Sequence, residues 1–394
     1  MQQKSIPCVV YELRASTATT TGALMLAPNA MRVLEEIGLL ARIQKQGHSF
    51  DTIIFKDSAG RTTDRFLMGS VPRYGYHAMR IHRHAVITEL KNLAAERGIA
   101  VHFERQISHV LEENQDGVTF QFADGSSDHA SVLIGADGIH SHIRGYVCPG
   151  YSQVYSGQIA LSAVTQQGVS EQLEDPGRSL PAVFHGRNGA LLMLPQSFDG
   201  SEVIVGTQLR YPEQDRAGWT RLASDGEELF NLWKQGIEEW EGLVPSVLEG
   251  VRHDAISVWP YYALPSIPRW VSSGKRVILV GDAAHAIAPT AGQGACQALE
   301  DALTLSVLFS SLSSPAAMGH GLEIWEKVRR ERVENVKALT LQLGNNRLSQ
   351  EEREKLPSGQ YWNSGAQPDL FWLYGVHVGE EFSRLYANHD ATVA

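Results

Sequence analysis

RVILVGDAAHAIAPTAGQGACQALEDA, residues 276–302, gives the strongest indication of the fold of this 394-residue chain. After its arginine the stretch starts with a continuous apolar run, which is typical of a parallel strand buried on both faces. We expect this strand to end at Gly281, where the missing side chain lets a ligand approach the backbone. Asp282 follows directly with a carboxylate that suits sugar-type hydroxyl groups. The stretch therefore predicts a strand–loop–helix unit that contacts a nucleotide.

The loop that follows is stiffened by Pro289 and leads through Gly292, Gln293 and Gly294 into a strongly predicted helix. Free N–H groups and the positive end of the dipole at the start of a helix favour an anion. An ordinary strand–helix unit with a glycine-rich turn has some of these features. The full order of GDAAHA, proline, GQG and ALEDA is more specific than that, and it favours a cofactor site. His285, inside GDAAHA, is expected to pack rather than to transfer protons.

A second apolar strand is predicted in VLIGADGIHSHIR, residues 132–144. It ends in a turn that contains Asp137 and Gly138 and is followed by a short helix with basic residues. Turns of this kind are common, so the segment is weak evidence when taken alone.

A third segment, RIHRHAVITEL, has Arg80 and Arg83 at the predicted start of a helix. The helix dipole disfavours a positive side chain at that end, and this conflict suggests that the arginines pair with a phosphate. A solvated basic turn is the alternative reading. His82 and His84 lack further ligands at metal-binding spacing, so no metal site is predicted.

The chain begins with MQQKSIPCVVYEL, in which Cys8–Leu13 reads as a parallel strand that carries the acid Glu12. In a dinucleotide-binding fold such an acid holds a ribose, and a glycine-rich phosphate loop stands roughly 20 residues earlier. No such loop precedes it in this sequence. We therefore expect an N-terminally truncated unit in which this strand exposes unpaired backbone or finds a new neighbour.

Composition excludes several classes of protein. The formal net charge is −10 without a basic block, which argues against nucleic acid binding. The chain has three widely spaced cysteines, no secretory signal and no apolar run long enough to span a membrane. These features predict a cytoplasmic protein with reduced thiols.

The order of the predicted elements indicates an α/β fold. A doubly wound, Rossmann-like domain is expected from residues 1–150 and 274–315. Residues 151–273 are predicted to form an inserted substrate domain with a mixed or antiparallel sheet. Residues 316–394 are predicted to be a C-terminal helical region.

Together these segments resemble the class A flavoprotein aromatic hydroxylases, the family of p-hydroxybenzoate and salicylate hydroxylases. The resemblance is strongest to fungal FAD-dependent monooxygenases of secondary metabolism. It covers most of the chain and runs through CVVYELR, GALMLAPNAMRVLEEIG, IHRHAVITEL, LIGADGIHSHIR, ISVWPYYALP and GDAAHA…GQG.

The resemblance implies a set of cofactor-binding positions. These are Glu12, Gly22, Arg83, Asp137, Gly138, Asp282, Pro289, Gly292, Gln293 and Gly294. Glu12 would hold the adenosine ribose, Arg83 would contact the FAD, and Asp282 would bind the ribityl chain. The turn with Asp137 is linked in the family to both FAD and nicotinamide, and the loop that ends at Gly294 lies against the isoalloxazine ring.

The implied activity is a monooxygenase reaction in which NAD(P)H reduces FAD and O2 supplies an oxygen atom to an aromatic or polyketide-like small molecule. The sequence departs from the family pattern in lacking the first strand and its G-x-G-x-x-G loop. Two alternatives therefore stay open: a non-redox cyclase or isomerase on the same scaffold, and a pseudoenzyme. The sequence leaves the oligomeric state undetermined.

Candidate catalytic residues lie in the middle third of the chain. Arg210 and Tyr211 follow a predicted strand, and His185 and Arg187 join them as candidate groups for proton transfer in the non-redox alternative. Tyr261 and Tyr262 in WPYYALP could also bind or deprotonate a phenol, which would activate the ring for oxygen transfer. Packing at the rim of a sheet is the alternative role for each of them.

Overall fold

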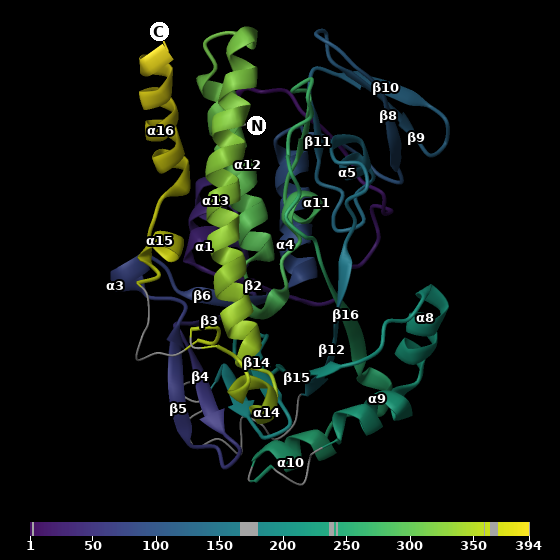
Figure 1. The fold of residues 1–394 in the computed structure, drawn as a ribbon, viewed down its shortest axis with the longest axis vertical. Coiled ribbons are helices and arrows are strands. Elements are labelled where there is room, and N and C mark those ends of the chain that lie inside the picture. Colours follow the sequence, from purple (N-terminus) through teal and green to yellow (C-terminus); the bar gives the residue numbers. More distant parts are fainter. Residues whose placement is uncertain are drawn as a thin grey trace.

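The computed structural model describes residues 1, 4–165, 180–235, 240, 241, 243–357, 359–362 and 369–393. Figure 1 shows the long helices α12 (Gly294–Ser311) and α13 (Met318–Asn345) along the long axis, with α16 (Val378–Val393) beside them. Helix α12 packs against α13, α16 and α1 (Pro28–Glu36). No helix in the described ranges is long and apolar enough to cross a membrane.

The predicted parallel strands are present as two separate pairs. Strand β1 (Val9–Tyr11) pairs with β7 (Ala100–His102), and β11 (Leu133–Gly135) pairs with β17 (Val277–Leu279). Within the described residues neither pair is joined to the other. Apolar side chains are exposed on both pairs, with 50% exposure at Val9 and 36% at Ile134. Among the described strands β1 pairs with β7 alone, so its other backbone edge is unpaired, as expected for the strand at Cys8–Leu13.

The largest sheet has seven strands in the order β16, β12, β15, β14, β13, β4, β5. The bounds are β16 (Ser257–Ala263), β12 (Val154–Thr165), β15 (Val203–Arg210), β14 (Ala190–Pro195), β13 (Ala182–His185), β4 (Thr52–Asp57) and β5 (Thr62–Leu67). Only β13 and β4 pair in parallel, so the predicted mixed sheet is present. Two of its strands come from residues 52–67, which the sequence analysis assigned to the other domain. The predicted domain limits themselves stay a prediction.

The two faces of this sheet pack against different partners, because successive side chains on a strand point to opposite faces. The outer face, with Phe184 and Leu191, packs against a layer of three helices. These are α8 (Arg216–Ser224), α9 (Gly226–Trp233) and α10 (Leu243–Glu249). The inner face, with Val183 and Leu192, packs against the core of the other half of the molecule.

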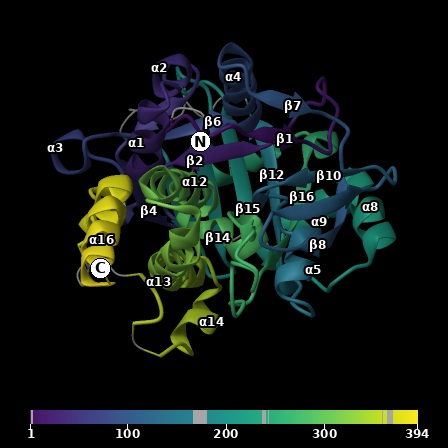
Figure 2. The ribbon, with the colours of Figure 1, turned by 90° about the horizontal axis from the view of Figure 1, so that it is seen from above.

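Two smaller antiparallel sheets complete the strands. One has the order β2 (Ala23–Leu26), β6 (Ala78–His82), β3 (His48–Phe50), and helix α4 (Arg83–Glu96) follows β6 directly. The other has the order β10 (Ser127–Ala130), β9 (Val118–Phe122), β8 (Ile107–Glu113). The remaining helices are α2 (Leu40–Ile43), α3 (Val71–Tyr74), α5 (His142–Val147), α11 (Asp282–His285), α14 (Gln350–Glu354) and α15 (Phe371–Tyr374). Short 3-10 turns cover η3 (His253–Ala255), η4 (Pro289–Ala291) and η5 (Pro315–Ala317). Figure 2 shows the same arrangement from above.

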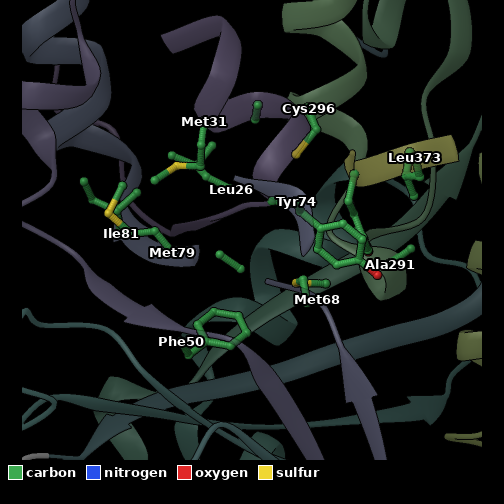
Figure 3. Packing of buried hydrophobic residues seen from close by; sticks show 14 of the residues in the cluster. Leu26, Met31, Phe50, Met68, Tyr74, Met79, Ile81, Ala291, Cys296 and Leu373 are labelled. Carbon is green, nitrogen blue, oxygen red and sulfur yellow. The ribbon is translucent and has the colours of Figure 1, made fainter. Parts of the chain in front are cut away.

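The central core holds the predicted cofactor loop in place. Figure 3 shows Ala291 of that loop, Cys296 of α12 and Leu26 of β2 within one apolar cluster. All three side chains are almost completely buried. Burial of this kind contributes roughly 25 cal/mol per Å² of apolar surface, so the cluster fixes the loop against both β2 and α12.

Candidate functional site

The strand–loop–helix unit is folded as the sequence predicts. Strand β17 leads into Gly281, which adopts φ +58, a conformation that favours glycine. Its N–H donates to Oδ2 of the buried Asp301 at 2.9 Å. A side chain here would also press on helix α12, because a Cβ would lie 3.1 Å from that of Ala298. The turn after the strand is therefore tight, and it places Asp282 at the start of α11.

The loop at Gly292 shows why glycine is required. The residue has φ +64, and a Cβ added to it would lie 2.7 Å from Cγ of Met25 in β2. The adjacent Gln293 is completely buried, and its Oε1 accepts hydrogen bonds from Asn29 Nδ2 at 3.1 Å and Gln297 Nε2 at 3.2 Å. Its own Nε2 donor has no partner among the described residues. The Gln293 side chain therefore joins the loop to α1 and α12.

Asp282, Arg83 and the start of α12 lie close to one another. A Cβ added to Gly294 would lie 3.9 Å from Oδ1 of Asp282. The surrounding protein raises the pKa of the Asp282 carboxyl, while the positive charges of His285 and Arg83 oppose that rise. The side chain of Asp282 is nevertheless exposed, so it can be reached from solution. The Asp282 carboxylate thus lies beside the start of α12, within the electrostatic range of Arg83.

Arg83 is the first residue of α4, and its backbone N–H donates to the carbonyl of Gly22 at 3.0 Å. Two positions predicted to bind the cofactor are therefore neighbours. Within the part of the chain that the structure describes, the Arg83 guanidinium forms no hydrogen bond or ion pair. Arg80, predicted at the same helix start, instead lies in strand β6. Its side chain is buried and donates through Nη2 to Oε1 of Gln196 at 3.1 Å.

Glu12 lies immediately after β1, where its backbone N–H donates to the His102 carbonyl at 2.9 Å. Its Oε1 accepts a hydrogen bond from the Arg14 N–H at 2.8 Å, which fixes the side chain. The carboxylate is half-buried and keeps its second oxygen available. This position at the end of a parallel strand is the one in which an acid can receive ribose hydroxyls.

Asp137 has a structural role that the sequence analysis did not assign. Its carboxylate accepts hydrogen bonds from the backbone N–H groups of His142 at 2.8 Å and Ile143 at 3.2 Å, and from the Ser141 hydroxyl. These bonds cap helix α5, so the carboxylate is already occupied within the protein. Gly138, beside it, has φ +78 and open space around its Cα.

Arg144 is a residue that sequence reasoning missed. It is 2% exposed, and it donates through Nη1 to the Ala283 carbonyl at 3.0 Å and through Nη2 to the Ile139 carbonyl at 2.6 Å. The guanidinium therefore fastens the turn at Gly138 to helix α11. Its basic character was visible in the sequence, but its partner lies 139 residues away.

A buried ionic network lies beneath the cofactor loop and was also missed. Arg329 of α13 donates to Asp301 Oδ1 at 2.8 Å and to Glu300 Oε2 at 2.7 Å, and all three side chains are fully buried. Arg332 donates to both oxygens of Glu300 at 2.6 and 2.8 Å. Asp301 also accepts from Nε2 of His285 at 2.6 Å. The acids in ALEDA were the available sequence signal, but their partners come from another helix.

The three residues predicted to be catalytic do not form one site. Arg210 is exposed and pairs with Glu352 at 2.6 Å. Tyr211 donates to Glu228 Oε1 at 3.1 Å, beyond the outer face of the sheet. His185 lines a pocket of about 300 Å³ together with Phe55, Asp64, Arg353, Tyr361 and Trp362.

His185 is neutral near pH 7. Burial, together with the positive charges of Arg353 and Arg347, lowers its pKa to about 4. Its Nε2 is buried without a hydrogen-bond partner. The ring can therefore offer this nitrogen to a ligand in the pocket.

Comparison with known proteins assigns the family. The FAD binding domain family matches residues 2–340. The chain belongs to this family. The resemblance inferred from the sequence is thereby confirmed, as is the predicted α/β fold class, while the N-terminal truncation stays a prediction.

Relatives within the family extend over nearly the whole chain. The 3-amino-4-hydroxybenzoate 2-monooxygenase PtnB3 of Streptomyces platensis is 29% identical, over 96% of this chain and 92% of its own length. The salicylate hydroxylase of Pseudomonas putida is 28% identical, over 85% of this chain and 79% of its own length. The structure of Klebsiella pneumoniae HpxO with FAD and uric acid superposes with a TM-score of 0.74, 22% identity and coverage of 90% and 88%.

The residues of the loop fit the flavin of this family's cofactor. The fit rests on the exposed Asp282 carboxylate, which accepts no hydrogen bond from the described residues, and on the Arg83 guanidinium, which has no partner among the same residues. Among the described residues, no group of three or more histidines, cysteines or acids is placed to hold a metal ion.

Proposed function

We propose that this protein is an FAD-dependent monooxygenase that hydroxylates an aromatic or other electron-rich ring, with NAD(P)H as the reductant. The observation that carries the proposal is the meeting of Arg83, Asp282 and the start of α12 on one side of the 289–294 loop. When bound, FAD supplies the redox chemistry by which NAD(P)H and O2 hydroxylate a ring. A role in secondary metabolism and a polyketide-like substrate stay predictions from the resemblance.

Each part of the cofactor would have its own residues in this chain. Asp282 and the backbone N–H groups at the start of α12 would hold the flavin end, where a negative charge is favoured by the helix dipole. Arg83 would pair with the pyrophosphate, since guanidinium groups match phosphate oxygens well. Glu12 would accept the hydroxyls of the adenosine ribose. The Asp137 carboxylate would act indirectly, because it already caps α5.

The substrate would lie between the 289–294 loop and the inner face of the seven-stranded sheet. His185 sits on that side of the sheet, because it is directly opposite Ala190 and that residue packs in the inner core. A neutral imidazole with a free Nε2 can accept a hydrogen bond from a phenol and thereby orient the ring. Arg210 would stand at the rim, and Tyr211 is left out of the proposed site because it lies beyond the opposite face.

The test is reconstitution of the purified protein with FAD, followed by its visible absorption spectrum. We expect a yellow protein that retains FAD through gel filtration and oxidises NAD(P)H faster when an aromatic substrate is present. Oxygen uptake and one hydroxylated product per NAD(P)H would establish the reaction. A folded protein that stays colourless with excess FAD would contradict the proposal.

A further inference from the structure

The methionine side chains of this protein differ in how far they are open to solution. Met25 of strand β2 and the first residue, Met1, are half-buried. The other five of the seven methionines are buried, with at most 7% of each exposed: Met31, Met68, Met79, Met193 and Met318. Oxidation of a thioether follows its exposure, so Met25 is the first methionine within the fold that an oxidant meets. The mechanism proposed above does not use its sulfur.

Met25 packs directly against the cofactor loop. A Cβ added to Gly292 would lie 2.7 Å from Cγ and 2.9 Å from Cβ of Met25, so the two residues are in close contact. The Cys296 thiol joins their backbones, because it donates weakly to the Gly292 carbonyl at 3.4 Å and to the Met25 carbonyl at 3.7 Å. The cluster around this contact is apolar and includes Ala291, Cys296 and Met68 (Figure 3). A change in the Met25 side chain is therefore passed on to the loop.

Two other sulfur atoms lie near the loop, and both are protected from an oxidant. Cys296 is completely buried, and burial raises the pKa of its thiol to about 12. The thiol therefore stays protonated near pH 7, and a thiol is a much weaker nucleophile than a thiolate. Met68, whose Cε would lie 3.9 Å from a Cβ on Gly292, is 1% exposed. Of these three sulfur-containing side chains, Met25 is the one that solution reaches.

Hydrogen peroxide converts a methionine thioether into a sulfoxide. A lone pair of the sulfur forms a bond to one peroxide oxygen, and the O–O bond breaks. The departing hydroxide takes the proton of the transferred oxygen and becomes water, so the sulfur is oxidised by two electrons and the peroxide is reduced. The sulfoxide is polar and accepts hydrogen bonds, whereas the cluster around Met25 is apolar. A buried acceptor without a donor is costly, so we expect the oxidised side chain to leave the cluster and to release Gly292.

We propose that Met25 is an oxidation site, at which hydrogen peroxide forms the sulfoxide and thereby loosens the 289–294 loop and weakens FAD binding. The effect on FAD rests on the proposed function, whereas the modification itself rests on the position of Met25. The oxidant has two sources: peroxide already in solution, and oxidation of NAD(P)H by O2 without hydroxylation of a ring. In the second, a hydride from NAD(P)H and a proton from water reduce O2 to hydrogen peroxide. Methionine sulfoxide reductases reverse the modification.

The experiment is limited treatment of the purified full-length protein with hydrogen peroxide, followed by peptide mass spectrometry. We expect Met25 to gain one oxygen atom about tenfold faster than Met68 or Met193, since a buried thioether reacts only when the structure opens locally. Equal rates at these three methionines would overturn the proposal. Catalase then removes the remaining peroxide before FAD is titrated.

The affinity for FAD shows the consequence, and each protein is compared with its own untreated form. Treatment should weaken FAD binding to wild type about 5- to 100-fold, which corresponds to the cost of an unsatisfied buried acceptor. Met25→Leu keeps an apolar side chain of similar size and should resist the treatment. Met193→Leu changes a buried methionine of the large sheet and should lose affinity as wild type does. An equal loss in wild type and Met25→Leu would overturn the proposal.

Two further measurements complete the test. Methionine sulfoxide reductase should restore the affinity of oxidised wild type, which tests the proposal without a variant should Met25→Leu not fold. The source of the oxidant is found with FAD-loaded protein that receives NAD(P)H in air without an aromatic compound. Met25 oxidation that catalase prevents comes from peroxide that has passed through solution, and oxidation that persists comes from peroxide that stays within the protein.

The outcomes separate the oxidation site from the proposed function. If FAD fails to bind, thermal denaturation reports the loop instead. A midpoint that peroxide lowers in wild type and not in Met25→Leu would then leave the oxidation site standing while the proposed function fails. If FAD binds and Met25 is oxidised no faster than the buried methionines, the oxidation site is overturned alone.

Discussion

Two sets of buried arginines lie on different sides of the cofactor loop. Arg329, beneath the loop, is completely buried and donates hydrogen bonds to Asp301, Glu300 and Gln297. Arg80, between the loop and the large sheet, is 8% exposed, and among the described residues its side chain donates only to the neutral amide of Gln196. Both cations lose hydration on folding, but within these residues only the first has its charge balanced by acids. The difference separates a cation whose charge the protein compensates from one whose charge it leaves uncompensated.

The first group explains how the cofactor loop is held. Asp301 joins Arg329 to the Gly281 N–H and to His285, and Glu300 joins Arg329 and Arg332 to Asn29. Asn29 in turn binds the Gln293 side chain in the loop itself. A continuous set of charge-assisted hydrogen bonds therefore connects helix α13 to both ends of the predicted flavin site. These bonds fix the loop, although Gln293 Nε2, Asn29 Oδ1 and His285 Nδ1 have no partner among the described residues.

The largest expected effect is on the paired group. Arg329→Met leaves Glu300 and Asp301 with less compensation in a buried site, and we expect it to lower the free energy of unfolding by about 3–5 kcal/mol. Urea denaturation followed by fluorescence measures this change. If Arg329→Met lowers the free energy of unfolding by less than about 1 kcal/mol, the buried network does not stabilise the fold. Arg329 and Arg80 would then not differ in their contribution to stability.

The same network predicts a specific pH dependence. Burial alone would raise the pKa of Glu300, but Arg332 and Arg329 outweigh it and hold the pKa at about 2 instead of 4.5. Because the folded-state pKa is the lower one, the stabilisation exists above pH 4.5 and is lost as the pH falls toward 2. The stability difference between wild type and Glu300→Gln should shrink by about 2 kcal/mol from pH 6 to pH 3. Urea titrations of both proteins at the two pH values give this number, and a constant difference would contradict the role of Glu300.

Arg83 is another arginine without a charged partner among the described residues. We expect its substitution to change the affinity for FAD. Arg83→Met should weaken FAD binding by about 10- to 100-fold, because a charge-assisted contact with phosphate is lost. Quenching of FAD fluorescence during titration measures the dissociation constant. Arg61→Met is the matched control, since that side chain is 82% exposed and remote from the loop. Equal affinities for wild type and Arg83→Met would place the pyrophosphate elsewhere.

The acids of the site allow a finer version of the comparison. The Asp137 carboxylate already accepts the backbone hydrogen bonds that cap α5. The Asp282 carboxylate is exposed and accepts no hydrogen bond from the described residues. Asp137→Ala should lower the free energy of unfolding by about 0.5–2 kcal/mol through loss of the cap, and Asp137→Asn should restore most of it. Thermal denaturation distinguishes the two variants. A tenfold loss of FAD affinity in Asp137→Asn would instead show direct contact of the Asp137 charge with the cofactor.

The parts of this account that the sequence could predict depend on local patterns. The strand before Gly281, the turn at Gly292 and the helix after it follow from an apolar run and from glycine positions within 19 residues. Arg80 was misplaced because RIHRH continues into a helix, and nothing local shows that β6 extends between β2 and β3. Arg210 and Tyr211 were grouped as neighbours, although alternation along a strand sends them to opposite faces. The network around Glu300 depends on two helices lying side by side, which no local pattern encodes.

The most direct test of the contrast is the unfolding free energy of wild type and Arg83→Met, each measured with and without FAD. Because Arg83 has no charged partner among the described residues, we expect the variant to be as stable as wild type within about 1 kcal/mol in the absence of FAD. The same excess of FAD should stabilise wild type more than the variant, since a ligand stabilises the state that binds it in proportion to the logarithm of its affinity. A loss of about 3–5 kcal/mol in Arg83→Met without FAD, with equal stabilisation of both proteins by FAD, would contradict the account.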